Sequence, residues 1–304
     1  MDSNLRLICL ARGLLSNRLK SLASAYALAK KLDRVLYVDW PDDERVLSLD
    51  VLFKEKFREF CLHEDEHSFD SHTAFYSSIN TIKAFNPSLL SLANSAQFFE
   101  ISADEDFVSN ARDICIYYSD FYPGIDSVEL RDFFKKTEFG FILKESLSFF
   151  LDKADIGLNT PSVHMRGRDF PCRELNLLLY YWRIKATIGD SSFFLATDDD
   201  AFREYIQKRC KGCTIASLQN LNISTNGDQI QSKLNKNLEG LLDQLILSQT
   251  NLKIFDRHST FSHVALLLSS GIVLNNPKVG LVGKTIALIK HYVNRIIQFF
   301  WKLK

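Results

Sequence analysis

The fold is decided by residues 5–40, which read LRLICLARGLLSNRLKSLASAYALAKKLDRVLYVDW. The apolar run 5–11 is typical of a buried strand, and the turn 12–18 interrupts it. Apolar residues then recur with a helical period, and Val35–Val38 forms a second apolar run before Trp40–Pro41. This order of strand, turn, helix and strand predicts one βαβ unit of a parallel α/β sheet. Such sheets bind ligands beyond the carboxyl ends of their strands, which is where the turn falls.

Length and composition set limits on the rest of the chain. Its 304 residues are enough for two packed halves, and 46% hydrophobic with 24% charged residues describes a globular protein. Lys and Arg (37) balance Asp and Glu (37), so nucleic acid is not an expected partner. No stretch is typical of a secretory signal or a membrane span, and six scattered cysteines suit a reducing compartment. We therefore expect a cytoplasmic protein.

Polar chemistry is most concentrated in Ser162–Asp169, directly behind Pro161. This stretch holds His164, Arg166, Arg168 and Asp169 after a short apolar run. Arginine is suited to phosphate because its planar guanidinium donates paired hydrogen bonds and stays charged. The stretch therefore predicts a diphosphate-binding site at the end of a strand. The alternative is a surface turn whose charges form weak exposed ion pairs.

A second strand end carries three consecutive carboxylates. The apolar run Ser192–Ala196 is followed by Thr197, by Asp198–Asp200 and by a predicted helix over 201–209. Paired carboxylates at such a place could hold Mg²⁺ or Mn²⁺ against a nucleotide diphosphate. Aspartates at a helix start also stabilise the helix dipole with no ligand present. Both interpretations stay open at this point.

Two later segments complete the set of candidate sites. Leu238–Ser248 predicts an amphipathic helix that carries Asp243, and Ser259–Ser262 precedes a predicted helix over 263–268. Hydroxyl and backbone N–H groups at the start of a helix can form an anion-binding site. Ordinary helix capping explains the hydroxyl residues at this position equally well. The tail 280–304 alternates apolar, aromatic and basic residues. It predicts a helix that either lies on an anionic membrane surface or packs on the first half.

These motifs together resemble the fucosyltransferase superfamily that includes the α1,2-, α1,6- and protein O-fucosyltransferases. The resemblance rests on an opening glycine-asparagine-arginine turn and on three later motifs, which here are Gly13, Asn17 and Arg18; His164 and Arg166; Ala196–Asp199; and Asp243 with Thr260, Phe261 and Ser262. Two positions depart from the pattern. Ser16 stands where a second glycine is common, and Gly167 stands where many relatives have a second arginine, so that Arg168 either substitutes for it or points elsewhere.

The resemblance implies a fold, a donor and residue roles. It implies an α/β GT-B protein of two Rossmann-like domains facing across a cleft: an acceptor-side domain 1–158, a nucleotide-sugar domain 159–279 and the basic helix 280–304. The implied reaction is inverting, metal-independent and cofactor-free transfer of L-fucose from GDP-fucose to a glycan acceptor, such as a lipid-linked bacterial O-antigen or capsule. His164 and Asp243 would contact the guanosine, Arg166 the β-phosphate, and Thr260–Ser262 the other phosphate oxygens.

The resemblance also implies that substrate is bound by Gly13, Asn17, Arg18, Thr197 and Asp198. Two points stay open within it. The general base would be Asp169 or an acid of the first domain. The motifs also fit an enzyme that uses another nucleotide sugar, or a binding module without turnover.

Overall fold

The computed structural model describes most of the two predicted halves. The described residues are 5–41, 46, 48–53, 73–78, 80, 82–83, 98–101, 113–118, 122, 125–136, 147–148, 150–152, 154–166, 173–210, 215–216, 229–255 and 259–269. Several predictions lie outside these residues, among them those for Arg168, Asp169 and the tail 280–304. Within the described ranges, no helix combines the length and the apolar character that crossing a membrane requires.

The chain forms an α/β fold and divides into two compact units. Unit 1 comprises Met1–Ile156, Leu221–Gln249 and Arg257–Ser270, and unit 2 comprises Gly157–Asn220, Thr250–Asp256 and Gly271–Lys304. The sequence placed residues 159–279 in one domain, whereas this division assigns two helices of that range to unit 1. The reason is packing: Leu241, Leu245 and Val264 of these helices belong to the core of the first sheet.

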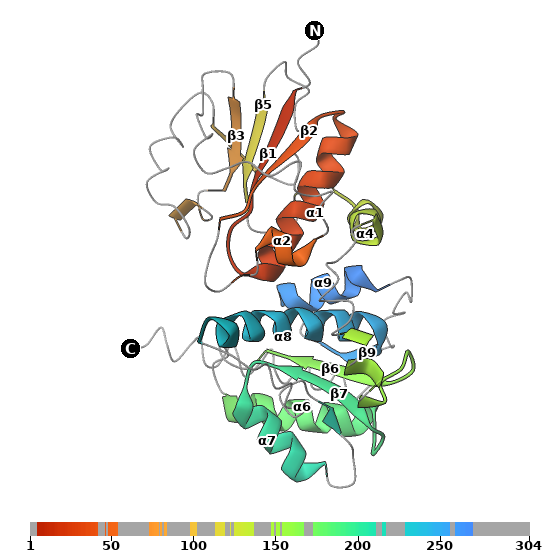
Figure 1. Cartoon of the computed structure of the whole chain (residues 1–304). Coiled ribbons are helices and arrows are strands. Elements are labelled where there is room, and N and C mark those ends of the chain that lie inside the picture. Colours follow the sequence, from red (N-terminus) through yellow and green to blue (C-terminus); the bar gives the residue numbers. More distant parts are fainter. Residues whose placement is uncertain are drawn as a thin grey trace, which may run out of the picture. The chain divides into compact units, whose positions relative to one another are not determined.

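Unit 1 is built on a five-stranded parallel sheet with the strand order β2-β1-β5-β3-β4. Its elements are β1 (Arg6–Leu10), α1 (Leu15–Lys31), β2 (Val35–Asp39), α2 (Leu49–Leu52), β3 (Thr73–Ser77), β4 (Phe98–Glu100), β5 (Asp113–Tyr117), α4 (Ser127–Lys136), α8 (Gln229–Gln249) and α9 (Thr260–Leu268). Figure 1 shows α1 lying along one face of this sheet, with α4 beside it. The predicted βαβ unit over 5–40 is confirmed.

Alternation along β1 explains how this sheet buries both faces. Leu7 and Cys9 belong to the cluster that includes α1, whereas Ile8 and Leu10 belong to a second cluster on the other face. Helix α1 packs closely because its inner side is made largely of Ala, Ser and Leu. Its buried Ser21 donates to the Tyr118 carbonyl oxygen, and Ser24 Oγ accepts from the Tyr122 N–H at 3.1 Å. These serines therefore enter the core with their hydroxyl groups hydrogen-bonded.

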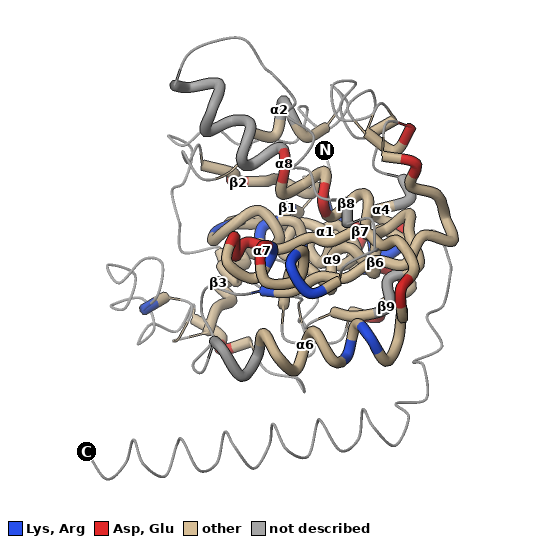
Figure 2. The backbone as a smooth tube through the Cα atoms, turned by 90° about the horizontal axis from the view of Figure 1, so that it is seen from below, with Lys and Arg blue, Asp and Glu red and all other residues tan. Residues whose placement is uncertain are grey.

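Unit 2 is built on a four-stranded parallel sheet with the strand order β8-β7-β6-β9. Its elements are β6 (Pro161–Met165), α6 (Arg173–Thr187), β7 (Phe193–Thr197), α7 (Asp200–Arg209), β8 (Ile215–Ala216) and β9 (Asn251–Ile254). Strand β7 is buried along its whole length, as its apolar run predicted. Both signs of charge occur along α7 (Figure 2), which is ordinary for a helix with a solvated face.

Candidate functional site

The first predicted motif lies at the carboxyl edge of the second sheet. His164 is buried within β6, the strand ends at Met165, and Arg166 follows it with a partly exposed side chain. Met165 pairs in register with Thr197, the last residue of β7, so that Arg166 and Asp198 leave adjacent strands at the same edge. This edge is where open parallel sheets bind ligands. One cation, Arg166, and one carboxylate, Asp198, therefore follow the ends of neighbouring strands.

The three aspartates that follow β7 have different local roles. Asp199 is buried and caps α7: its Oδ1 accepts from the Ala201 N–H at 3.0 Å and the Phe202 N–H at 3.2 Å. Asp200 forms an ion pair with Arg203 at 2.7 Å. Thr197 Oγ1 accepts from the Asp199 N–H at 3.2 Å, which fixes the turn. Asp199 and Asp200 thus serve the helix start, the second of the two interpretations of this acidic run.

In the part of the chain that the structure describes, no group of three or more His, Cys, Asp or Glu side chains is arranged to hold a metal ion. The carboxylates at Asp199 and Asp200 have the partners given above. Among the described residues, the predicted site residues on β6, on β7 and directly after them are His164, Arg166, Thr197 and Asp198.

In unit 1, the turn between β1 and α1 is shaped by a glycine in the left-handed region. Gly13 has φ of +85°, and a Cβ at this position would lie 3.0 Å from Asn17 Nδ2. Helix α1 then starts at Leu15 without a side-chain cap, and the Asn17 and Arg18 N–H groups both donate to the Leu14 carbonyl oxygen. The turn thus requires glycine at position 13 and brings Asn17 against it.

Arg18 is inside the protein. Only 2% of this residue is exposed. Its Nε donates to the Gly13 carbonyl oxygen at 3.0 Å, its Nη1 donates to the Pro41 carbonyl oxygen at 2.6 Å, and its guanidinium lies 5.3 Å from the ring centroid of Trp40. The sequence predicted a substrate contact at Arg18. In the structure these contacts hold the turn 13–18 against the end of β2, and the substrate contact stays a prediction.

The third predicted motif falls on α8 and α9 of unit 1. Thr260, Phe261 and Ser262 form the first turn of α9, which begins three residues earlier than predicted. The preceding Ser259 is buried and makes no side-chain cap, whereas Asp243 on α8 is half-buried. Next to it, Gln244 donates to Ser16 of α1 at 2.8 Å and to the Phe261 carbonyl oxygen at 3.1 Å. The structure therefore brings the predicted α9 turn next to the predicted α1 turn.

The predicted residues are accordingly divided between the two units. Unit 1 holds Gly13, Asn17, Arg18, Asp243, Thr260, Phe261 and Ser262, and unit 2 holds His164, Arg166, Thr197 and Asp198. Arg168 and Asp169 lie outside the described residues.

Sequence reasoning passed over one polar cluster at the carboxyl edge of the first sheet. Arg12, just beyond β1, forms an ion pair with the buried Asp39 at the end of β2. The same guanidinium lies 5.7 Å from the ring centroid of Tyr117 at the end of β5, and burial raises the pKa of the Tyr117 hydroxyl. The signal in the sequence was that each residue ends, or directly follows, an apolar run. It becomes visible only when these strands are known to be neighbours.

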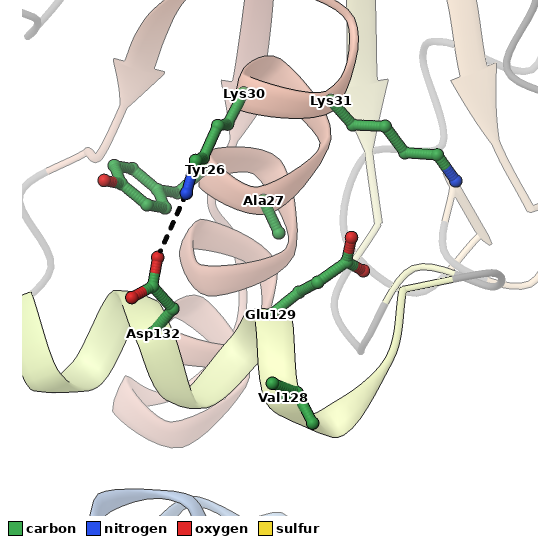
Figure 3. A pocket seen from close by; sticks show the side chains of 7 residues that line it. All are labelled: Tyr26, Ala27, Lys30, Lys31, Val128, Glu129 and Asp132. Atoms are coloured by element: carbon green, nitrogen blue, oxygen red, sulfur yellow. Dashed lines mark hydrogen bonds and ion pairs between the residues drawn. The ribbon is translucent and has the colours of Figure 1, made fainter.

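A surface pocket of about 430 Å³ lies away from all these residues. Tyr26, Ala27, Lys30, Lys31, Val128, Glu129 and Asp132 line it, from the end of α1 and the start of α4. Figure 3 shows Lys30 reaching toward Asp132, and their ion pair measures 3.3 Å. Because α1 runs back from the carboxyl edge, its last turn lies toward the opposite edge of the sheet. None of the predicted site residues lines this pocket.

The sequence matches no protein-family model and no curated protein. Solved structures do resemble it. The NodZ α1,6-fucosyltransferase soaked with GDP-fucose aligns with a TM-score of 0.62 and 16% identity, covering 88% of this chain and 93% of its own. NodZ from Bradyrhizobium, as a separate structure, aligns with a TM-score of 0.61 at 16% identity, covering 88% and 92%.

Two further structures extend the likeness. POFUT1 in complex with GDP-fucose aligns with a TM-score of 0.52 and 13% identity, covering 88% of this chain and 94% of its own. FUT1 from Arabidopsis thaliana, as a mutant in complex with GDP, aligns with 0.55 and 14%, covering 88% and 69%. The TM-scores of 0.52–0.62 show a common architecture at identities of 13–16%, so this chain has the α/β fold of these fucosyltransferases.

Proposed function

We propose that the protein is a glycosyltransferase that moves L-fucose from GDP-fucose to a glycan acceptor with inversion at the anomeric carbon. The proposal includes a GT-B arrangement, in which the two parallel-sheet units bind donor and acceptor between them. Two findings support it. The chain shares its fold with fucosyltransferases that were solved with GDP-fucose or GDP. The residues that resemble the donor motifs also fall at a strand edge and a helix start, where phosphates bind.

One observation carries the proposal: Arg166 at the carboxyl edge of the inner strand β6. The strand has β7 on one side and β9 on the other, so its direction is fixed by two ladders. Buried side chains at Val163 and Met165 anchor it further. The backbone that carries this guanidinium is therefore held in place before an anion binds, so that only the side chain has to be ordered.

Fucosyl transfer requires the protein to stabilise the diphosphate of the departing GDP. The bond between the fucose anomeric carbon and the β-phosphate oxygen breaks, and its electron pair leaves with GDP. The acceptor hydroxyl oxygen forms the new bond from the opposite face and gives its proton to a base. Attack from the opposite face inverts the anomeric centre and yields an α-linked fucose. Arg166 would balance the charge that accumulates on GDP, an effect worth about 2.7 to 4 kcal/mol per donor in other enzymes.

Three further parts of the predicted site would bind the donor around this centre. His164 and Asp243 would contact the guanosine, and the first turn of α9 would contact the phosphate oxygens through Thr260 and its backbone. Ser262 is fully buried, so we assign phosphate binding to the start of this turn. The proposed base is Asp169 or an acid of unit 1. In this proposal Asp199 and Asp200 keep their partners at the start of α7, and the reaction needs no divalent ion.

As the acceptor, we propose a bacterial surface glycan, such as a lipid-linked O-antigen or capsule precursor. It would be modified in the cytoplasm or at the inner face of the membrane. The tail 280–304 would provide contact with that surface. Unit 1 would select the acceptor, because the carboxyl edge of its sheet carries Arg12, Asp39 and Tyr117.

The test combines binding and turnover. Calorimetry with GDP, UDP and GDP-fucose is expected to show binding of both guanosine compounds and none of UDP. Release of GDP from GDP-fucose, with EDTA present, is then measured with and without bacterial polysaccharide as acceptor, and GDP-mannose serves as the second donor. A preference for GDP-mannose would assign another sugar. Binding without any GDP release would assign a module without turnover, and absence of GDP binding contradicts the proposal altogether.

A further inference from the structure

A buried amide connects the starts of two helices in unit 1. Gln244 of α8 is fully buried, and its Nε2 donates to Ser16 Oγ at 2.8 Å and to the Phe261 carbonyl oxygen at 3.1 Å. Ser16 belongs to the first turn of α1, and Phe261 belongs to the first turn of α9. Both amide hydrogens of one side chain are therefore used, one for each helix start.

The surroundings of Gln244 favour an apolar residue at this position. Its neighbours along α8, Leu241 and Leu245, pack into the core of the first sheet. A buried amide in such a place costs free energy unless its groups are hydrogen-bonded. Here the nitrogen is satisfied, but the buried Oε1 has no hydrogen-bond partner among the described residues. An incompletely satisfied group in a core needs an explanation other than stability.

The two turns that the amide connects are those expected to bind substrate. Ser16 lies between Gly13 and Asn17, and Phe261 lies between Thr260 and Ser262. These segments are far apart in the sequence: Ser16 and Gln244 are separated by 228 positions. The hydroxyl oxygen of Ser16 accepts the hydrogen bond from the amide nitrogen, and Ser16 is itself buried. A single side chain is therefore hydrogen-bonded to both turns.

We propose that Gln244, with Ser16, is a positioning residue that keeps the turn 13–18 and the first turn of α9 in a fixed relation. This inference rests on the proposed function. The α9 turn would hold the donor phosphates, while the α1 turn would lie beside the fucosyl and acceptor groups. A shift between the turns would then alter the alignment of the reacting groups more than the affinity for GDP, because misalignment affects the transition state most.

Three variants test this inference. Gln244→Met keeps the volume of the side chain and removes both hydrogen bonds, and Ser16→Ala removes one acceptor. The third variant is the double substitution. Gln249→Met is the matched control, because this residue has the same chemistry but is exposed at the end of α8.

The expected result is a separation of kcat from binding. We expect Gln244→Met to lower kcat for GDP release from GDP-fucose at least tenfold and to change the Kd for GDP by no more than about threefold. Ser16→Ala should lower kcat about threefold to tenfold. The double variant should be no slower than Gln244→Met alone, because coupled residues are not additive. Gln249→Met should match the wild type.

Hydrogen exchange keeps this test separate from the proposed function. If the wild type releases no GDP from GDP-fucose, the proposed function fails, yet the linkage can still be measured. Gln244→Met should then speed amide exchange in the first turns of both α1 and α9, whereas Gln249→Met should not. Unchanged exchange at both helix starts in a folded Gln244→Met protein, or an unchanged kcat in an active one, would overturn the inference.

Discussion

Arg18 allows the sharpest test of how unit 1 is held together. Replacing it with Met keeps most of the apolar stem and removes the guanidinium. The Gly13 and Pro41 carbonyl oxygens then lose their charged donor, and Trp40 loses the cation above its ring. Hydrogen bonds from charged donors contribute about 1.5–3 kcal/mol each, and a desolvated cation–π contact contributes about 2 kcal/mol.

These contributions are offset in part because burying a guanidinium is itself costly. We therefore expect Arg18→Met to lower the free energy of unfolding of unit 1 by about 3 kcal/mol, which is within the range for breaking a buried charged network. Arg18→Lys is the control. A lysine keeps the charge but lacks the planar fork that reaches two separate carbonyl groups, so about half of the loss should remain.

Urea unfolding measures this change. Trp40 reports on the site directly when Trp182 and Trp301 are replaced by Phe, because the chain has three tryptophans. A loss below about 1 kcal/mol for Arg18→Met, with an unchanged dependence on urea, would refute the internal role of this residue. So would an Arg18→Lys protein that is as stable as the wild type but no longer binds GDP-fucose, since that result would indicate direct contact with substrate.

The remaining predictions concern the start of α7 and the buried thiols. Asp199→Ala removes the acceptor of the Ala201 and Phe202 N–H groups, and we expect thermal or urea unfolding to show a loss of about 1–2 kcal/mol; Asp198→Ala, at the neighbouring exposed position, is the control. Burial raises the pKa of Cys9 from 9.0 to about 12. Because the unfolded thiol ionises first, the contribution of Cys9 is fully present below pH 9 and is lost as the pH rises toward 12. Unfolding free energies measured from pH 8 to pH 11 should therefore decline above pH 9 in the wild type and decline less in Cys9→Ala; equal declines would contradict the shift.

Local patterns allowed much of the fold to be predicted. The strands β1, β2, β6 and β7 and the helices α1 and α7 fall within a few residues of where apolar periodicity placed them. Periodicity is a local property, so it needs no knowledge of partners. Strands β3 and β4 were missed because they lie within a long segment rich in Phe, Ser and acidic residues, where short aromatic runs carry little period.

Residues whose role depends on distant partners could not be predicted in the same way. The burial of Arg18 depends on Trp40 and Pro41, and a charged residue in a first helical turn is ordinarily solvated. The assignment of α8 and α9 to unit 1 depends on the packing of Leu241, Leu245 and Val264, which no boundary in the sequence marks. The position of Arg166 at the carboxyl end of a strand could be predicted, because this residue directly follows the strand in the sequence.

Stabilisation of the departing diphosphate by Arg166 can be measured as one ratio of rate constants. This ratio is kcat for GDP release from GDP-fucose by the wild type over that by Arg166→Ala, measured with EDTA present and at saturating donor. Loss of one such donor lowers kcat about 10²–10³-fold in other enzymes. We predict a ratio in this range, with partial recovery in Arg166→Lys. A ratio near one in a folded variant, or wild-type turnover that EDTA abolishes, would contradict the account.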